Sequence, residues 1–192
     1  MKYITIVFSL FLVSCGTFEL SSESVLQSYN SETKTLHLEE KNISGFVYLN
    51  TYKPEEEIVD IMLQNNSIEV VDVTGYTDLE LLNISNNKIN YFWDIKLPEQ
   101  ILHLNASGNN LSTLDGIEKL KRLKTLDLRN NKLDSADLEK LGDLENLKVV
   151  LVDGNPDVSQ ELINDLRDFS LKYIATIKNP EILDSDKHSY LK

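Results

Sequence analysis

A short pattern recurs along this chain every 21 to 25 residues, and this periodicity constrains the fold more than any other feature. Each copy reads apolar, any residue, apolar, two of any residue, Asn, any residue, apolar, and residues 126–133 give the clearest example. Copies begin at positions 36, 61, 82, 104, 126 and 150, although the first has Lys41 in place of Asn and the last loses its final apolar residue. Six copies at nearly constant spacing indicate a repeat architecture in which each unit packs mainly against its neighbours.

The two apolar positions of each copy predict a short strand, because residues two apart lie on the same face of a strand. One such strand cannot bury its apolar face alone, so we expect stacked repeats to form a parallel sheet over a continuous core. The Asn that follows has amide donors and acceptors that can satisfy backbone groups in a tight turn. We therefore expect a buried structural ladder of Asn66, Asn87, Asn109, Asn131 and Asn155, whereas Asn110 and Asn130 should tolerate substitution if they are exposed.

The segments between the predicted strands vary. Apolar residues spaced three apart in residues 112–125 indicate a 3₁₀ or short α-helical element. Asp134 and Asp157 are each expected to start a helix, and residues 173–177 are expected to form a last, degraded strand. The 22-residue copy closely resembles the leucine-rich repeats of bacterial internalins. Over about residues 35–178, this resemblance implies an α/β solenoid with short parallel strands on the concave face and 3₁₀, helical and loop segments on the convex face.

The first fifteen residues have the features of a processing signal. Lys2 precedes an apolar run over residues 3–13, which is too short to span a bilayer and is typical of a signal peptide. The run ends in Leu12, Val13, Ser14 and Cys15, and Gly16 follows. These residues resemble the lipobox of bacterial lipoproteins. Alternatives are an ordinary secretory peptide with an incidental Cys, or a buried strand with a free thiol.

The lipobox resemblance implies removal of residues 1–14 and acylation of Cys15, including palmitate-type chains. Cys15 is the only cysteine, so an intrachain disulfide and a Cys-ligated metal site are excluded. Residues 15–34 are expected to carry the lipid and act as a flexible tether, since they are polar and lack a sustained apolar period. The implied location is the bacterial cell envelope, at the outer membrane if the owner is Gram-negative, because no Asp follows the Cys.

Two surface regions are candidates for partner binding. Solvent-facing strand positions should line the concave face, which is the usual binding surface of such solenoids. We assign seven candidates there: Asn83, Ser85, His103, Asn105, Ser107, Asp127 and Arg129. The alternative is that this polar face is merely solvated. Tyr91 and Trp93 form a second candidate patch on either side of a core Phe92, although both could instead pack against a neighbouring repeat.

Composition and motifs limit the function. A formal net charge of −12 argues against nucleic acid or anionic headgroups as the main partner, since both require basic patches. The three histidines are far apart in sequence and no catalytic motif is present, so we expect no enzyme activity, cofactor or metal. Residues 153–164 lack the Gly and bidentate Glu of a calcium loop.

The expected function is that of a monomeric, lipid-anchored envelope protein that binds an unknown protein partner through its concave face. The first alternative is a structural envelope protein without a specific ligand, and a hydrolase with a scattered site is the second. Residues 179–192 form a polar tail that is expected to cover the last edge of the sheet or to fray.

Overall fold

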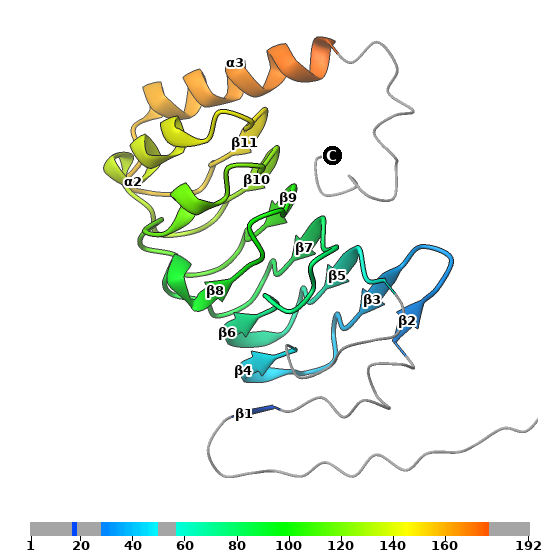
Figure 1. The fold of residues 1–192 in the computed structure, drawn as a ribbon. Helices are drawn as coiled ribbons and strands as arrows, with labels where there is room; N and C mark the ends of the chain where they lie inside the picture. The colour runs from blue at the N-terminus through cyan, green and yellow to red at the C-terminus, as the bar shows by residue number, and fades with distance from the viewer. Residues whose placement is uncertain (1–16, 19–27, 50–56, 177–192) are drawn as a thin grey trace, which may run out of the picture.

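The computed structural model describes residues 17–18, 28–49 and 57–176, which form a solenoid of stacked turns (Figure 1). Its main sheet has seven strands in the order β11-β10-β9-β7-β5-β3-β2. All neighbours are parallel except β2 and β3, which are antiparallel. The strands are β2 (Tyr29–Asn30), β3 (Thr35–His37), β5 (Asp60–Met62), β7 (Leu81–Asn83), β9 (His103–Asn105), β10 (Thr125–Asp127) and β11 (Val149–Leu151).

The register of this sheet follows the sequence repeat. The first apolar residue of each copy lies beside its equivalents in the neighbouring strands, and these residues are Leu36, Ile61, Leu82, Leu104, Leu126 and Val150. They are at most 1% exposed and belong to a single core that runs through the stack. Burying each such side chain contributes roughly 1.5–3 kcal/mol, so every repeat is stabilised mainly by the repeats on either side.

A second parallel sheet lies on the opposite side of the solenoid in its first repeats. Its order is β1-β4-β6-β8, and its strands are β1 (Thr17–Phe18), β4 (Ser44–Tyr48), β6 (Ser67–Asp72) and β8 (Ile95–Lys96). Later repeats carry helical segments there. The segments η2 (Ile117–Lys119), α2 (Ser135–Glu139) and η3 (Lys140–Asp143) lie where helices were expected, whereas η1 (Phe92–Asp94) was not predicted. Early repeats form strands instead because residues 67–72 are rich in Ile and Val, which favour extended backbone.

The folded part begins earlier than the sequence indicated. Tyr29 and Asn30 pair with Leu36 and Thr35, so part of the segment expected to be a flexible tether forms a hairpin with β3. The side-chain Oδ1 of Asn30 accepts a hydrogen bond from the backbone N–H of Glu32 at 3.0 Å and holds the turn. This hairpin covers the edge of β3, whose backbone groups would otherwise be open to pairing with another chain.

Asp134 starts α2 as expected, because its carboxylate accepts the backbone N–H of Asp137 at 2.9 Å. The start predicted at Asp157 is wrong. The last helix, α3 (Gln160–Thr176), begins three residues later, where the Ser159 hydroxyl accepts the backbone N–H of Leu162. Asp157 instead forms an isolated bridge with Asp134, because the turn of the last repeat is not yet complete at that point.

α3 covers β11 and closes the upper end of the solenoid (Figure 1). The strand predicted over residues 173–177 is wrong, since residues 173–176 lie within α3. No helix among the residues that the structure describes is long and apolar enough to cross a bilayer. The expected signal peptide, Cys15 and the tail over residues 179–192 lie outside the described residues.

Candidate binding face

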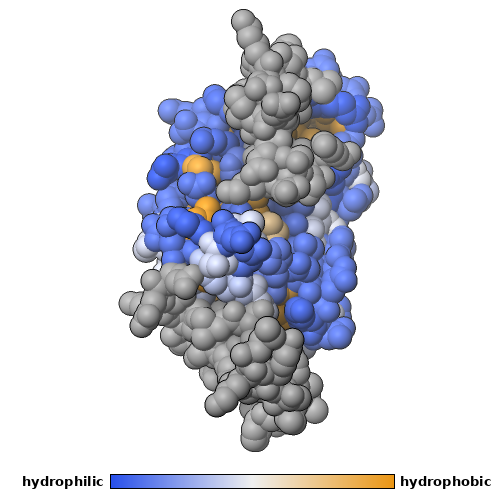
Figure 2. All heavy atoms as spheres, turned by 90° about the vertical axis from the view of Figure 1, so that its right-hand side faces the viewer, coloured by the Kyte–Doolittle hydropathy of each residue, from blue (hydrophilic) through white to orange (hydrophobic). Residues whose placement is uncertain are grey.

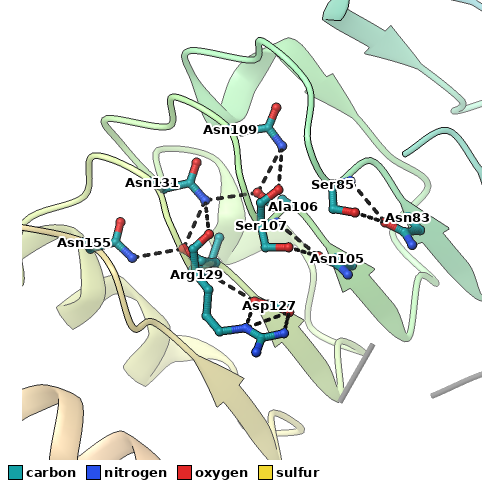
Figure 3. A network of polar contacts seen from close by, with 11 residues as sticks. Asn83, Ser85, Asn105, Ala106, Ser107, Asn109, Asp127, Arg129, Asn131 and Asn155 are labelled. Atoms are coloured by element: carbon teal, nitrogen blue, oxygen red, sulfur yellow. Dashed lines mark hydrogen bonds and ion pairs between the residues drawn. The ribbon is translucent and has the colours of Figure 1, made fainter. Parts of the chain in front are cut away.

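The five Asn side chains of the expected ladder occupy equivalent turns. In Asn109, the side-chain Nδ2 donates to the carbonyl oxygens of Ala106 and Ile84 at 3.1 and 3.0 Å. Its Oδ1 accepts the backbone N–H of Ile89 at 3.1 Å. Each Asn therefore joins its own turn to the preceding repeat, and the same pattern holds for Asn66, Asn87, Asn131 and Asn155. Asn109, Asn131 and Asn155 are visible in Figure 3. These side chains stabilise the turns that hold the concave strands.

A second column runs beside this ladder, and the sequence analysis missed it. The residue before each ladder Asn has a positive φ of 55° to 78°, a conformation that favours Gly and Asn. This column consists of Asn65, Asn86, Gly108, Asn130 and Gly154. The signal was present in the sequence, because only Asn or Gly occurs at this position in these five repeats.

Four of the seven concave candidates, namely Asn83, Ser85, Asn105 and Asp127, are not solvent-facing. Asn83, Asn105 and Asp127 are 8%, 4% and 1% exposed. Each side-chain Oδ1 accepts the backbone N–H of the residue two positions later, at 3.0–3.1 Å, and so folds back over its own strand. The expectation that these three side chains and that of Ser85, which is 7% exposed, face solvent is therefore wrong. Alternation along a strand predicts the direction of a side chain but not its local hydrogen bonding.

The side chain two positions after each of Asn83, Asn105 and Asp127 donates a hydrogen bond back to it. We call this pair of residues the concave polar motif. The hydroxyls of Ser85 and Ser107 donate to Asn83 and Asn105 at 2.8 and 2.7 Å. Ser85 is buried, whereas Ser107 is half-buried and remains partly accessible. The polar side chains of this face thus hold one another in place (Figure 3).

Asp127 and Arg129 form the charged version of this motif. The Nη2 of Arg129 donates to the Oδ2 of Asp127 at 2.6 Å, and its Nε donates to Oδ1 at 3.0 Å. The Asp127 side chain is fully buried, while that of Arg129 is 36% exposed. Hydrogen bonding to Asp127 raises the pKa of Arg129, so the guanidinium stays charged and its orientation is fixed.

His103, Ser107 and Arg129 are the accessible members of the original seven. Thr125 lies beside His103 in the sheet register, and its Oγ1 is 2.9 Å from Nδ1 of His103. Arg129 lies beside Ser107, because the backbone N–H of Gly108 bonds to the Arg129 carbonyl at 2.8 Å. Where described residues face the viewer in Figure 2, this surface is mostly hydrophilic with a few separate hydrophobic spots. Such a face favours polar contacts over a large apolar anchor.

The second candidate patch lies on the other side of the molecule, in the segment that carries η1. Tyr91 and Trp93 are 43% and 52% exposed, and Phe92 between them is buried in the core. The two exposed rings stack on one another with centroids 4.6 Å apart and an interplanar angle of 13°. Both rings are therefore surface groups that contact one another.

The described residues contain no group of three or more His, Cys, Asp or Glu side chains that could hold a metal ion. His37 and His103 both lie on the main sheet, but β5 and β7 separate their strands. The described residues thus bring no pair of histidines together in one place.

Comparison with known proteins identifies the repeats. Residues 100–140 match the family model of leucine-rich repeats in two copies. A segment of 77 residues, or 38% of the chain, is 36% identical to a probable inactive serine/threonine-protein kinase of Dictyostelium discoideum. The chain spans only 4% of that protein. The crystal structure of an internalin from Listeria monocytogenes aligns with 59% of this chain and 46% of its own, at 20% identity and a TM-score of 0.33. The chain carries leucine-rich repeats and folds as a leucine-rich-repeat solenoid.

Proposed function

We propose that this protein is a non-enzymatic binding module that is held at the bacterial cell envelope by acyl groups on Cys15. Its concave sheet contacts a protein partner. The anchor is supported by the lipobox-like residues before Cys15 and by the absence of any other thiol in the sequence. Several acyl chains on one residue give stable membrane attachment, whereas a single chain gives only marginal binding.

The observation that carries the binding proposal is the ordered polar surface of β9, β10 and the residues that follow them. His103 lies in β9, and Ser107 and Arg129 follow β9 and β10, which are adjacent parallel strands about 4.8 Å apart. Their hydrogen bonds to Thr125, Asn105 and Asp127 fix them before a partner arrives. Side chains that are already ordered lose little conformational entropy on binding, so this surface is suited to recognition.

A substitution at Ser107 tests the concave face without removing its charges. Ser107→Tyr places a large side chain beside Arg129 and should abolish capture of the partner by crosslinking in the native envelope. Ser107→Ala is the matched comparison, because it removes the hydroxyl bond to Asn105 without adding bulk, and it should reduce capture far less than Ser107→Tyr. If both variants capture the same proteins as the wild type, the concave face is not the binding surface.

The same pair of variants separates the module from a structural envelope protein. A structural role requires self-association that does not depend on the concave face, and this would appear as homotypic crosslinks that persist in Ser107→Tyr. Partner capture that is saturable and is lost only in Ser107→Tyr supports the binding module.

The anchor has its own test. Cys15→Ala should move the protein from the membrane fraction to the soluble fraction, because the acylated residue is lost. Mass spectrometry of the wild-type N-terminus should show acyl groups on Cys15. An unmodified Cys15 in membrane-bound mature protein contradicts the anchor and leaves the concave-face test unaffected.

A further inference from the structure

Aromatic side chains gather on the outer sheet, on the side of the solenoid opposite the concave strands. Tyr48, Tyr91 and Trp93 are 37%, 43% and 52% exposed. Among the described residues, they are three of the four large hydrophobic side chains that are exposed. The ring of Phe46 stacks on that of Tyr48 at a centroid distance of 6.4 Å and an angle of 4°. With the half-buried Val70, these residues form what we call the outer aromatic strip: Phe46, Tyr48, Val70, Tyr91 and Trp93.

The strands of the outer sheet and η1 beside them carry the residues of this strip. Phe46 of β4 lies beside Val70 of β6, and the next residue, Val71, lies beside Ile95 of β8. Trp93 is two residues before Ile95, in η1, which contacts β6. Val47, between Phe46 and Tyr48, is fully buried, so the two aromatic rings are on the outer face.

The outer sheet also takes in the chain segment that follows Cys15. β1 pairs in parallel with β4, with Thr17 beside Phe46. Cys15 is two residues before Thr17, and two residues of chain span at most about 7 Å. The attachment point of any lipid on Cys15 therefore lies within about 7 Å of Thr17, which is beside Phe46 at the edge of the outer sheet.

From these placements we propose that the outer aromatic strip lies in the interface of the lipid bilayer that holds the anchor. This inference rests on the proposed acylation of Cys15. It means that the outer sheet faces the membrane and that the concave sheet, on the opposite side, faces outward to a partner.

The chemistry of the strip fits a lipid interface. Tyr and Trp have an apolar ring and a polar group, and they are enriched where hydrocarbon meets headgroups. Asp72 lies beside Tyr48 in the sheet register, and its Oδ2 is 4.0 Å from the Nζ of Lys96 on the next strand, so charges of both signs lie next to the strip. It does not need anionic headgroups, which a chain with a net charge of −12 would repel. The anchor also keeps the strip near the bilayer, so weak insertion suffices.

Trp93 is the only tryptophan of the chain, and this allows a direct test. The full chain, purified with its acyl groups, is reconstituted into phosphatidylcholine vesicles, and the Trp93 emission is recorded. The proposal expects a shift of the emission maximum to shorter wavelength, quenching by vesicles with brominated acyl chains, and protection from iodide. Cys15→Ala mixed with the same vesicles should show none of these changes.

A second probe position controls for the presence of the vesicle itself. Trp93→Phe combined with Arg122→Trp moves the single indole to an exposed loop before β10. This probe should remain open to iodide and insensitive to brominated lipid. Tyr48→Ser with Tyr91→Ser, which leaves Trp93 in place, should weaken the lipid quenching of Trp93.

The outcomes distinguish failure of the inference from failure of the anchor. If the protein is acylated and vesicle-bound but Trp93 is as open to iodide as in Cys15→Ala, the strip does not meet the membrane and the inference is overturned. If the purified protein is not acylated, the anchor fails. Cys15, the only thiol, is then coupled to a maleimide lipid in the same vesicles, and the same two quenching measurements decide whether the strip docks.

Discussion

The side-chain Oδ1 of Asn86 occupies the space in which a Cβ atom on Gly108 would lie. Asn130 and Gly154 have the same relationship two repeats further along. Asn86 is held in place because its Nδ2 donates to Oδ1 of Asn65 at 2.8 Å. In these two places of the left-handed column, an Asn side chain thus fills the space beside the Gly of the next repeat.

Gly108→Ala should lower the free energy of unfolding by about 2 kcal/mol or more, because a left-handed backbone costs an L-residue about 1–2 kcal/mol and Asn86 must also move. Urea unfolding measures this. Gly142→Ala is the control: Gly142 is exposed, lacks a positive φ, and its Cβ would meet nothing within 4 Å. If both variants lower the free energy of unfolding by a similar amount, the left-handed backbone at Gly108 is not the cause of the destabilisation.

The sequence predicted the main sheet well because each repeat supplies the same few apolar positions, and stacking leaves them a single register. It did not predict the outer strands of the early repeats, since residues 44–48 and most of residues 67–72 lie beyond the end of the motif. The helix over residues 160–176 was only partly predicted. Its end contains β-branched and aromatic residues that favour a strand, yet residues 173–176 continue the helix, so the local preference does not decide the backbone there.

The candidate site was predicted only in part. Period-two alternation correctly indicates that Asn105 and Ser107 leave the strand on the concave side. It does not show that Asn105 bonds back to the Ser107 backbone and becomes buried, because that depends on the rotamer. Similarly, the sequence indicates that Tyr91 and Trp93 flank a core residue. It does not indicate that their rings stack on one another, because this depends on the side-chain rotamers in the folded structure.

Asn131→Ala should lower the free energy of unfolding by about 1–3 kcal/mol, because it leaves buried backbone groups of two repeats unpaired. The neighbouring Asn130 was expected to be neutral, but its φ of +55° changes that expectation. Asn130→Ala should cost about 1 kcal/mol through backbone strain, whereas Asn130→Gly should cost less. Thermal unfolding of the three variants checks this order, and equal shifts for Asn130→Ala and Asn130→Gly would exclude strain.

Asp94→Asn should stabilise the protein at neutral pH. Burial raises the pKa of Asp94 above its ordinary value of 3.8, so the folded state holds the proton more tightly than the unfolded state. Stability from this group is therefore present at low pH and is lost as the pH rises through the raised pKa. The difference in the free energy of unfolding between Asp94→Asn and the wild type should therefore increase as the pH rises from 3.8 through the raised pKa of Asp94. A difference that is constant with pH would show that the charge of Asp94 is not responsible.

The pair Asp127 and Arg129 can be exchanged for the neutral motif of the two preceding repeats, Asn83 with Ser85 and Asn105 with Ser107. Arg129→Ser alone leaves the fully buried Asp127 carboxylate without its guanidinium. This should cost about 1–3 kcal/mol, since a buried acceptor loses its charged partner.

The double variant Asp127→Asn with Arg129→Ser should recover most of this loss, because a neutral amide oxygen needs only the backbone N–H and hydroxyl donors that Asn105 already has in the next strand. Unfolding of the two single variants and the double variant forms a thermodynamic cycle that isolates the coupling between positions 127 and 129. The cycle also serves the binding proposal. If the double variant is stable and still captures the partner, Arg129 has only a structural role. If it is stable but capture is lost, the guanidinium contacts the partner.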